Sequence, residues 1–273
     1  MSEAPEKNQL VLREDQDGVA VLTINRPEAR NAMNRDVMTR LHRLLGAIEE
    51  DDTVDVVVFT GSGDKSFVAG ADINELAVRT PIDGLNAVMQ RLYERIAGFS
   101  KPTVAAVNGY AFGGGHELAL ACDIRIGSVN AQFALPETGL GIIPAAGGTQ
   151  RLAKIIGVGR AVDMMLTGRR FDAEDAYRAG LITELVEPQE LIEAGHATAQ
   201  RIRGKGPLAI KLVKTVVQRG FDVDHETGVL LESLAQAVLY SSEEKAEGTR
   251  AFLEKRRPDF ESVRHDRAQE ANT

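Results

Sequence analysis

The sequence predicts an α/β protein in which strand–strand–helix units stack around one core. Val-rich, continuously apolar runs such as "VDVVVFTG" are typical of strands that are buried on both faces, and amphipathic helical patterns lie between them. Residues 54–73 and 103–124 also share one order: a Val-rich strand, a glycine-containing loop and a short segment that ends in Asp-Ile. Units of this kind bury their apolar faces against one another, and each brings a loop to the same edge.

The first expected elements are a hairpin and a helix. "QLVLRED" and "GVAVLTINRP" are β-rich runs, and the Asp17-Gly18 pair between them favours a hairpin. Asn34 is the expected N-cap of a helix, because the apolar residues after it repeat at the spacing of an amphipathic helix. These residues are Val37, Met38, Leu41, Leu44, Leu45 and Ile48. The strand "VDVVVFTG" completes the opening unit.

The rest of the chain is expected to be mostly helical. Helical patterns lie at residues 83–98, 147–166 and 172–179, and a last short strand is expected around 181–188. From residue 189 to 257 only helix-forming segments occur, interrupted at "RGKGP" and "RGFDVDHE". They carry more apolar residues than a solvated arm needs. The sequence therefore predicts a core at residues 1–195 and, at 196–273, a helical region that packs on the core or on another subunit.

The composition excludes several classes of protein. The 40 Asp and Glu residues against 32 Lys and Arg give a net charge of −8, which argues against nucleic-acid binding. The single cysteine, Cys122, predicts neither a disulfide framework nor a Cys-based metal site. No apolar run approaches the roughly 18 residues of a membrane span. Because "MSEAPEKNQ" resembles neither a secretory signal nor an organellar presequence, we expect a cytoplasmic protein, although a processed organellar enzyme would look the same.

Three consecutive glycines, Gly113 to Gly115, lie between the strand "KPTVAAVNG" and the helix-forming "HELALACD". The first amides of a helix lack internal partners, and glycines let a ligand oxygen approach them closely. The alternative is a tight turn or close backbone packing. Gly70 and Ala71 in "SFVAGADI" follow a similar turn, and two amides that face each other would form an oxyanion hole.

Two glutamates, Glu117 and Glu137, have mainly apolar neighbours in the sequence. Glu117 is followed by Leu, Ala, Leu and Ala, and Glu137 lies in the loop "ALPETGLGII". A buried carboxyl must be paired, protonated or functional, so both are candidate general acids or bases, although Glu117 alternatively faces solvent. Two carboxyls in one pocket divide the acid and base roles. His116 is expected to point away from Glu117 and to take no catalytic part.

Four segments together resemble the crotonase, or enoyl-CoA hydratase, family: "NRPEARNAM", "FVAGADI", "KPTVAAVNGYAFGGGHELALACD" and "PETGLGIIPAAGGTQRL". They occur in family order, and the resemblance runs from about residue 10 to about residue 260. It implies a spiral of ββα turns with a C-terminal helical trimerisation region, assembled as a homotrimer or homohexamer. It also implies that basic residues of "AFLEKRRPDF" approach the coenzyme A of a neighbouring subunit.

The resemblance also assigns roles to residues. The amides of Ala71 and Gly114 would form the oxyanion hole for the thioester carbonyl, and Gly113 and Gly115 would leave room for the thioester. Glu117 would activate water for attack on the β-carbon, and Glu137 would protonate the α-carbon. The residues that would bind the substrate are Ala29, Arg30, Ala69, Gly70, Ala71, Asp72, Ile73, Asn74, Gly113 and Gly114. Coenzyme A would be part of the substrate, and neither a separate cofactor nor a metal is expected.

The presence of both glutamates favours addition of water to a 2-enoyl-CoA, giving a 3-hydroxyacyl-CoA, as in fatty acid β-oxidation or branched-chain acyl-CoA degradation. The alternatives are a hydratase of the methylglutaconyl-CoA type and an enoyl-CoA isomerase, while RNA binding is improbable for so acidic a chain. One departure is Ala145 in "PAAGGTQ", where many hydratases have glycine. Its methyl group is expected near the water site and would tighten the acyl pocket.

Overall fold

The computed structural model describes residues 10–260 and 262–263. The N-terminal stretch on which the cytoplasmic expectation depends lies outside the described residues. The chain divides into two compact units, residues 1–199 and 200–273. This boundary falls within α9 (Leu191–Arg203), a few residues beyond the division expected from the sequence.

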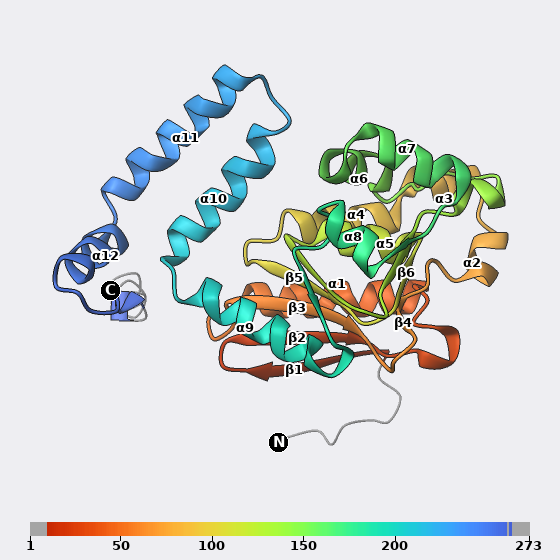
Figure 1. Ribbon diagram of the computed structural model, residues 1–273, viewed down its shortest axis with the longest axis horizontal. Helices are drawn as coiled ribbons and strands as arrows, with labels where there is room; N and C mark the ends of the chain where they lie inside the picture. Colours follow the sequence, from red (N-terminus) through yellow and green to blue (C-terminus); the bar gives the residue numbers. More distant parts are fainter. Residues whose placement is uncertain (1–9, 261, 264–273) are drawn as a thin grey trace. The chain divides into compact units, whose positions relative to one another are not determined.

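The first unit contains a six-stranded sheet with the strand order β1-β2-β3-β5-β7-β10 (Figure 1). Its first two strands form the expected antiparallel hairpin, and the other neighbours are parallel. Asp17 and Gly18 both have positive φ, 47° and 75°, as a type I′ turn requires. The strands are β1 (Val11–Gln16), β2 (Val19–Ile24), β3 (Val56–Gly61), β5 (Thr103–Val107), β7 (Ile124–Ser128) and β10 (Glu184–Val186).

A second sheet of four short strands has the order β4-β6-β8-β9. Its members are β4 (Ser66–Val68), β6 (Tyr110–Phe112), β8 (Gln132–Ala134) and β9 (Phe171–Asp172). The strands β4, β6 and β8 each follow a strand of the larger sheet, so each turn of the chain adds one strand to each sheet. This confirms the predicted α/β class with stacked ββα turns, although the sequence patterns did not separate these short strands from the loops around them.

The helix α1 (Arg35–Glu49) forms as its apolar spacing predicts. Its buried residues are the six apolar positions named above, and the side chain of Asn34 accepts a hydrogen bond from the amide of Val37 at 2.9 Å. The remaining helices of this unit are α2 (Ile73–Ala77), α3 (Pro81–Asn86), α4 (Val88–Ala97), α5 (Gly114–Ala121), α6 (Gly148–Ile156), α7 (Val158–Thr167) and α8 (Ala173–Arg178). Short 3₁₀ turns lie at η1 (Pro27–Ala29), η2 (Glu137–Leu140) and η3 (Pro188–Glu190).

Two of the expected helices are each broken into two. Ala87, with φ of 46°, separates α3 from α4, and Gly157, with φ of 84°, separates α6 from α7. A residue in this region cannot continue a right-handed helix. The apolar pattern runs through the break at Gly157 because α6 and α7 both bury apolar residues, whereas α3 buries none and its Ile82 and Leu85 are exposed. The prediction of single helices at 83–98 and 147–166 was therefore wrong.

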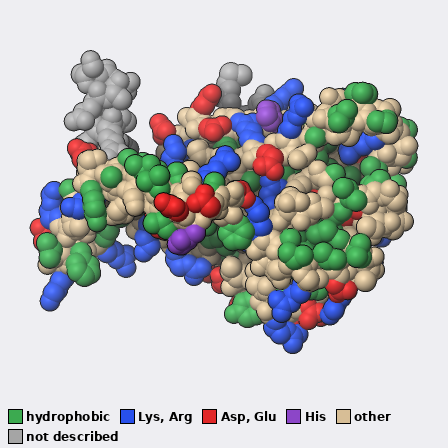
Figure 2. Space-filling view, turned by 90° about the horizontal axis from the view of Figure 1, so that it is seen from above, with side chains coloured by type: hydrophobic (Ala, Val, Ile, Leu, Met, Phe, Trp, Pro, Cys, Tyr) green, Lys and Arg blue, Asp and Glu red, His purple; other side chains and the backbone are tan. Residues whose placement is uncertain are grey.

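In its described part, the second unit contains α10 (Pro207–Gly220), α11 (His225–Tyr240) and α12 (Glu243–Leu253). The breaks at "RGKGP" and "RGFDVDHE" are confirmed, and a further one occurs at Ser242, which caps α12. Within α10 and α11 no residue is buried, and apolar side chains are exposed there (green in Figure 2). Among the described residues, no helix is long and apolar enough to cross a membrane.

Candidate active site

Three loops meet where the strands of the smaller sheet end. The strands β4, β6 and β8 run parallel as neighbours, so their carboxyl ends lie at one edge. Ala69 to Ala71 follow β4, Gly113 follows β6, and Leu135 to Glu137 follow β8. The amide of Gly113 donates to the carbonyl of Ala134 at 2.9 Å, which ties the second loop to the third.

The amide nitrogen of Ala71 lies close to Gly114. Ala71 is bridged to Met33 through its neighbours, because the Met33 amide donates to the Gly70 carbonyl (2.8 Å) and the Asp72 amide to the Met33 carbonyl (3.0 Å). This pairing turns the N–H of Ala71 itself away from Met33. A Cβ atom on Gly114 would lie 3.6 Å from the Ala71 nitrogen. Within the described chain, neither amide has a backbone acceptor.

The two remaining glycines of the triplet differ in what they contact. Gly113 has φ of 52°, and a Cβ atom there would lie 3.1 Å from Oε1 of Glu137, so this glycine faces the site. A Cβ atom on Gly115 would instead overlap the carbonyl oxygen of Val68 in β4. Close backbone packing, the alternative raised for the triplet, therefore explains Gly115 better than access for a thioester.

Glu117 is buried on α5, with 3 % of its surface exposed, so it does not face solvent. Its Oε1 accepts hydrogen bonds from the amides of Ala146 (2.7 Å) and Gly148 (2.8 Å). Burial raises the pKa of Glu117, while these two amides and the charge of Arg151 lower it in part. The two donors were not predicted from the sequence, although the glycines of "PAAGGTQ" mark the turn that carries them.

Arg151 braces the turn that holds Glu117. Its Nη1 donates to the carbonyl of Ala146 at 3.0 Å, and its Nη2 donates to Glu94 at 2.6 Å. Arg151 thus holds the peptide unit that lies between the two that donate to Glu117. The side chain of Ala145 is exposed, and the Ala146 amide is engaged with Glu117.

Glu137 begins the turn η2 and has 9 % of its surface exposed. Its Oε2 is buried and has no hydrogen-bond partner within the described chain. Burial raises the pKa of Glu137 to about 7, and the nearby charge of Glu117 adds to this effect against a hydrogen bond from its own backbone. The structure thus brings together the two glutamates singled out in the sequence and gives them different surroundings.

The other predicted substrate-binding residues surround Ala71. The amide of Ala69 donates to the carbonyl of Arg30 at 3.1 Å, so the segment with Ala29 and Arg30 lies against the loop after β4. The Asp72 side chain caps α2, accepting from the amide of Asn74 at 3.1 Å. Ile73 is exposed.

His116 is fully buried beside the site and packs on Phe133, with ring centroids 5.4 Å apart. Burial lowers the pKa of His116 to about 3, against a smaller opposing effect of the Ala134 backbone. The ring is therefore neutral at ordinary pH, which fits a packing role.

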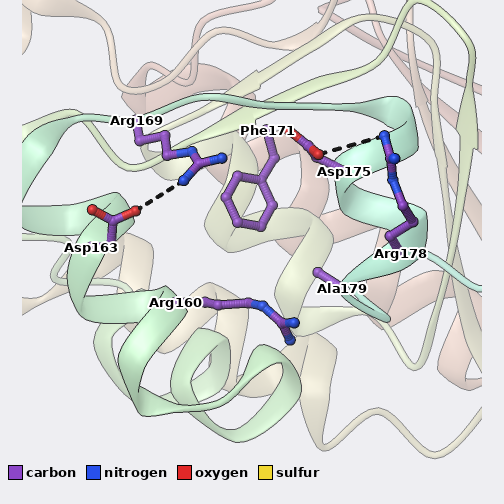
Figure 3. Close-up of a pocket in the computed structure, with 7 residues that line it drawn as sticks. All are labelled: Arg160, Asp163, Arg169, Phe171, Asp175, Arg178 and Ala179. Carbon is purple, nitrogen blue, oxygen red and sulfur yellow. Dashed lines mark ion pairs between the residues drawn. The ribbon is translucent and has the colours of Figure 1, made fainter.

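A separate cavity of about 270 Å³ lies between α7, β9 and α8, and no predicted site residue lines it (Figure 3). Its arginines are largely paired, since Arg169 lies 3.5 Å from Asp163 and Arg178 lies 3.7 Å from Asp175 (Figure 3). Within the described residues, no group of three or more His, Cys, Asp or Glu side chains could hold a metal ion.

Comparisons with known proteins agree with this geometry. Residues 14–264 match the family described as enoyl-CoA hydratase/isomerase. The short-chain-enoyl-CoA hydratase of Clostridium acetobutylicum is 43% identical over 254 residues, which are 92% of this chain and 97% of the relative. The crotonyl-CoA hydratase of Syntrophomonas wolfei is 41% identical over the same shares of each chain. The 2,3-dehydroadipyl-CoA hydratase of Escherichia coli is 40% identical over 90% of this chain and 96% of the relative.

A solved structure shows the same fold. The crystal structure of an enoyl-CoA hydratase from Bacillus anthracis matches with a TM-score of 0.89 and 37% identity, covering 92% of this chain and 99% of that one. In these comparisons, the match covers nearly the whole length of both this chain and the relative or solved structure. The two sheets, the loops at their edge and these matches together show that the chain belongs to the enoyl-CoA hydratase/isomerase family and has the crotonase fold.

Proposed function

We propose that the chain is a 2-enoyl-CoA hydratase, a hydro-lyase that adds water across the 2,3 double bond of a thioester to give a 3-hydroxyacyl-CoA. The observation that carries this proposal is the meeting of two buried carboxyls, Glu117 and Glu137, at loops that also carry the adjacent amides of Ala71 and Gly114. Hydration requires a base for water, an acid for the α-carbon and donors for the enolate oxygen.

The different surroundings of the two glutamates support separate roles. Glu117 accepts two amide hydrogen bonds, which favour its carboxylate form and suit it to act as the base. Glu137, with a pKa of about 7 and an Oε2 that finds no hydrogen-bond partner among the described residues, keeps a proton that it can donate. Neither role calls for a cofactor other than the coenzyme A of the substrate.

In the proposed reaction, Glu117 takes a proton from water as the water oxygen bonds to the β-carbon. The electron pair of the double bond moves to the thioester, whose oxygen becomes an enolate facing the amides of Ala71 and Gly114. The enolate then collapses, and the α-carbon takes the proton of Glu137. Transfer of a proton from Glu117 to Glu137 restores the enzyme, and one water molecule has been added.

We propose short enoyl thioesters, with crotonyl-CoA as the first candidate, because two relatives carry short-chain and crotonyl names. A carboxylated enoyl-CoA is the second candidate, since the relative from Escherichia coli is named for dehydroadipyl-CoA. The test is a substrate panel of crotonyl-CoA, longer enoyl-CoAs, methylglutaconyl-CoA and 2,3-dehydroadipyl-CoA. Hydration of each is measured as the loss of the enoyl thioester absorbance. The product should be the 3-hydroxyacyl-CoA, whereas an isomer with a shifted double bond would identify an isomerase.

We further propose that the enzyme is cytoplasmic, serves acyl-CoA degradation such as β-oxidation, and assembles as a homotrimer or homohexamer. The exposed apolar side chains of α10 to α12 support the assembly, because faces of this kind normally contact another surface. Analytical ultracentrifugation should give three or six times the chain mass, and a monomer would contradict it. In a gel shift at physiological ionic strength, RNA should stay unbound.

A further inference from the structure

The Ala71 amide is a useful donor only while the backbone around it keeps its orientation. The residues that hold it come from a distant part of the sequence, residues 26–33, which we call the strap. Three backbone hydrogen bonds join the strap to residues 69–72. They run from Ala69 to Arg30 (3.1 Å), from Met33 to Gly70 (2.8 Å) and from Asp72 to Met33 (3.0 Å).

The side chain of Arg26 binds both the strap and the segment 69–72. Its Nη1 donates to the carbonyl of Ala32 at 2.7 Å, and Nη1 and Nη2 lie 3.3 and 3.2 Å from Oδ2 of Asp72. Ala32 directly precedes Met33, and Asp72 directly follows Ala71. One guanidinium therefore connects the strap with the residue next to the donor amide.

The strap itself is fixed to the core by Asn31. This residue is fully buried, has φ of 59°, and accepts a hydrogen bond from the amide of Arg26 at 3.0 Å. Its side-chain amide donates to the carbonyls of Ser62 (2.9 Å) and Ser66 (2.7 Å). Arg26 is thus held by a rigid segment, and the Asp72 side chain is held by Arg26 in turn.

We propose that Arg26 is a positioning residue for hydration: through Asp72 it fixes the orientation of the Ala71 amide toward the thioester oxygen. The inference deepens the proposed function and depends on it for the identity of the bound carbonyl. The side chains of Arg26 and Asp72 are only 14% and 16% exposed, so their attraction is less screened than that of a surface pair. Lysine would not replace the planar fork that spans two acceptors.

The variants that test this are Arg26→Met, Arg26→Lys and Asp72→Asn. The matched control is Arg13→Met, which removes partly exposed ion pairs outside the site, with Asp15 and Asp51, both at 2.6 Å. Arg26→Met should lower kcat for crotonyl-CoA by about 10- to 100-fold, since a misplacement of about 1 Å can cost that much, while KM stays within about threefold. Arg26→Lys should recover part of the loss, and Arg13→Met should leave kcat unchanged.

The second readout is the carbonyl stretch of butyryl-CoA labelled with ¹³C at the thioester, measured by isotope-edited infrared spectroscopy. Butyryl-CoA has no double bond to hydrate, so the measurement is independent of turnover. Binding to the wild type should lower the stretch frequency, because hydrogen bonds polarise the carbonyl. Arg26→Met should lose at least half of this shift, and Arg13→Met should keep all of it.

A full shift and unchanged kcat in Arg26→Met would overturn the inference, and so would a wild type that shifts no carbonyl frequency. A wild type that shifts the frequency but hydrates no enoyl-CoA would refute the proposed function, and the variants' shifts would still decide the inference. If Arg26→Met does not fold, Asp72→Asn decides. It keeps a side-chain oxygen for the α2 cap and loses the charge that Arg26 binds, and a full shift there counts against the inference.

Discussion

The surroundings of Glu117 and Glu137 differ although the residue type is the same. Glu117 lies on α5 and receives two amides from the turn at 146–148, which Arg151 braces. Glu137 lies in a short 3₁₀ turn, and its Oε2 has no donor within the described residues. Within the described residues, the structure thus places a carboxyl bound by two amides of another turn beside one whose Oε2 has no hydrogen-bond partner.

The difference shows how one residue type can supply both an acid and a base. Burial raises the pKa of both groups, and hydrogen-bond donors then decide how much of the shift remains. Because the two groups interact, the observed pKa values belong to the pair. Substitution of one carboxyl at a time therefore tests how far the two groups differ.

Removal of either carboxyl should have the largest effect. Glu117→Gln and Glu137→Gln keep the size of the side chain and lose the proton-transfer group, so each should lower kcat by at least about 100-fold. Initial rates with crotonyl-CoA, together with circular dichroism to verify folding, measure this. Hydration near the wild-type rate by either variant would refute the assigned roles.

The pH dependence of the wild type should be the next largest effect. If Glu137 must carry a proton, kcat/KM should fall about tenfold per pH unit above its pKa of about 7. If Glu117 must be ionised, kcat/KM should also fall on the acid side, below its raised pKa. The residual rate of Glu137→Gln should lose the alkaline limb and keep the acid one; persistence of the alkaline limb would assign it to another group.

Glu137 should make the stability of the wild type depend on pH, and Glu137→Gln should remove this dependence. Glu137 has a pKa of about 7 in the folded chain against 4.5 for a solvated glutamate, so the folded state binds more protons between these values. Its contribution to the free energy of unfolding is fully present below pH 4.5 and is lost as the pH rises through 7. Glutamine removes this loss, so the variant should gain roughly 1–3 kcal/mol relative to the wild type between pH 5 and pH 8.

Urea unfolding at both pH values, with the protein concentration held constant, measures this difference. The matched control is Glu117→Gln, which replaces a carboxyl that accepts two amide hydrogen bonds. Relative to the wild type, its free energy of unfolding should rise less between the two pH values. Equal stability differences at both pH values would mean that Glu137 is not the buried, protonated group described above.

The smallest effect is expected from Arg151→Met. The variant loses the hydrogen bond to Ala146 and the positive charge that lowers the pKa of Glu117. The acid limb of kcat/KM should move upward by less than about one pH unit, and kcat at neutral pH should fall about three- to tenfold. A pH–rate profile measures both. An unmoved acid limb would show that the amides alone set the acidity of Glu117.

Much of the fold could be predicted where local patterns are long. The apolar spacing of α1 gave its buried face, and Asp17-Gly18 gave the hairpin. The strands of the smaller sheet have only two or three residues, too few to show an alternating pattern. The helix breaks depend on backbone conformations at Ala87 and Gly157 that the continuous apolar pattern conceals.

In the site, too, some features could be predicted from local sequence patterns and others could not. The burial of Glu117 and Glu137 could be inferred from their apolar neighbours in the sequence. Ala146 contributes its backbone amide, a group that every residue except proline possesses, so its side chain gives no signal. The contact of Arg26 with Asp72 joins residues that are 46 positions apart, and only the folded chain brings them together.

The contact of Gly115 with β4 has a consequence for substrate choice. The helix that carries Gly114 and the strand that leads to Ala71 touch through backbone atoms, with no side chain between them. The distance between the two amides is therefore set by backbone packing and not by side chains. If the two amides bind the thioester oxygen as we propose, side chains around the acyl group could be exchanged for a new substrate without moving these donors.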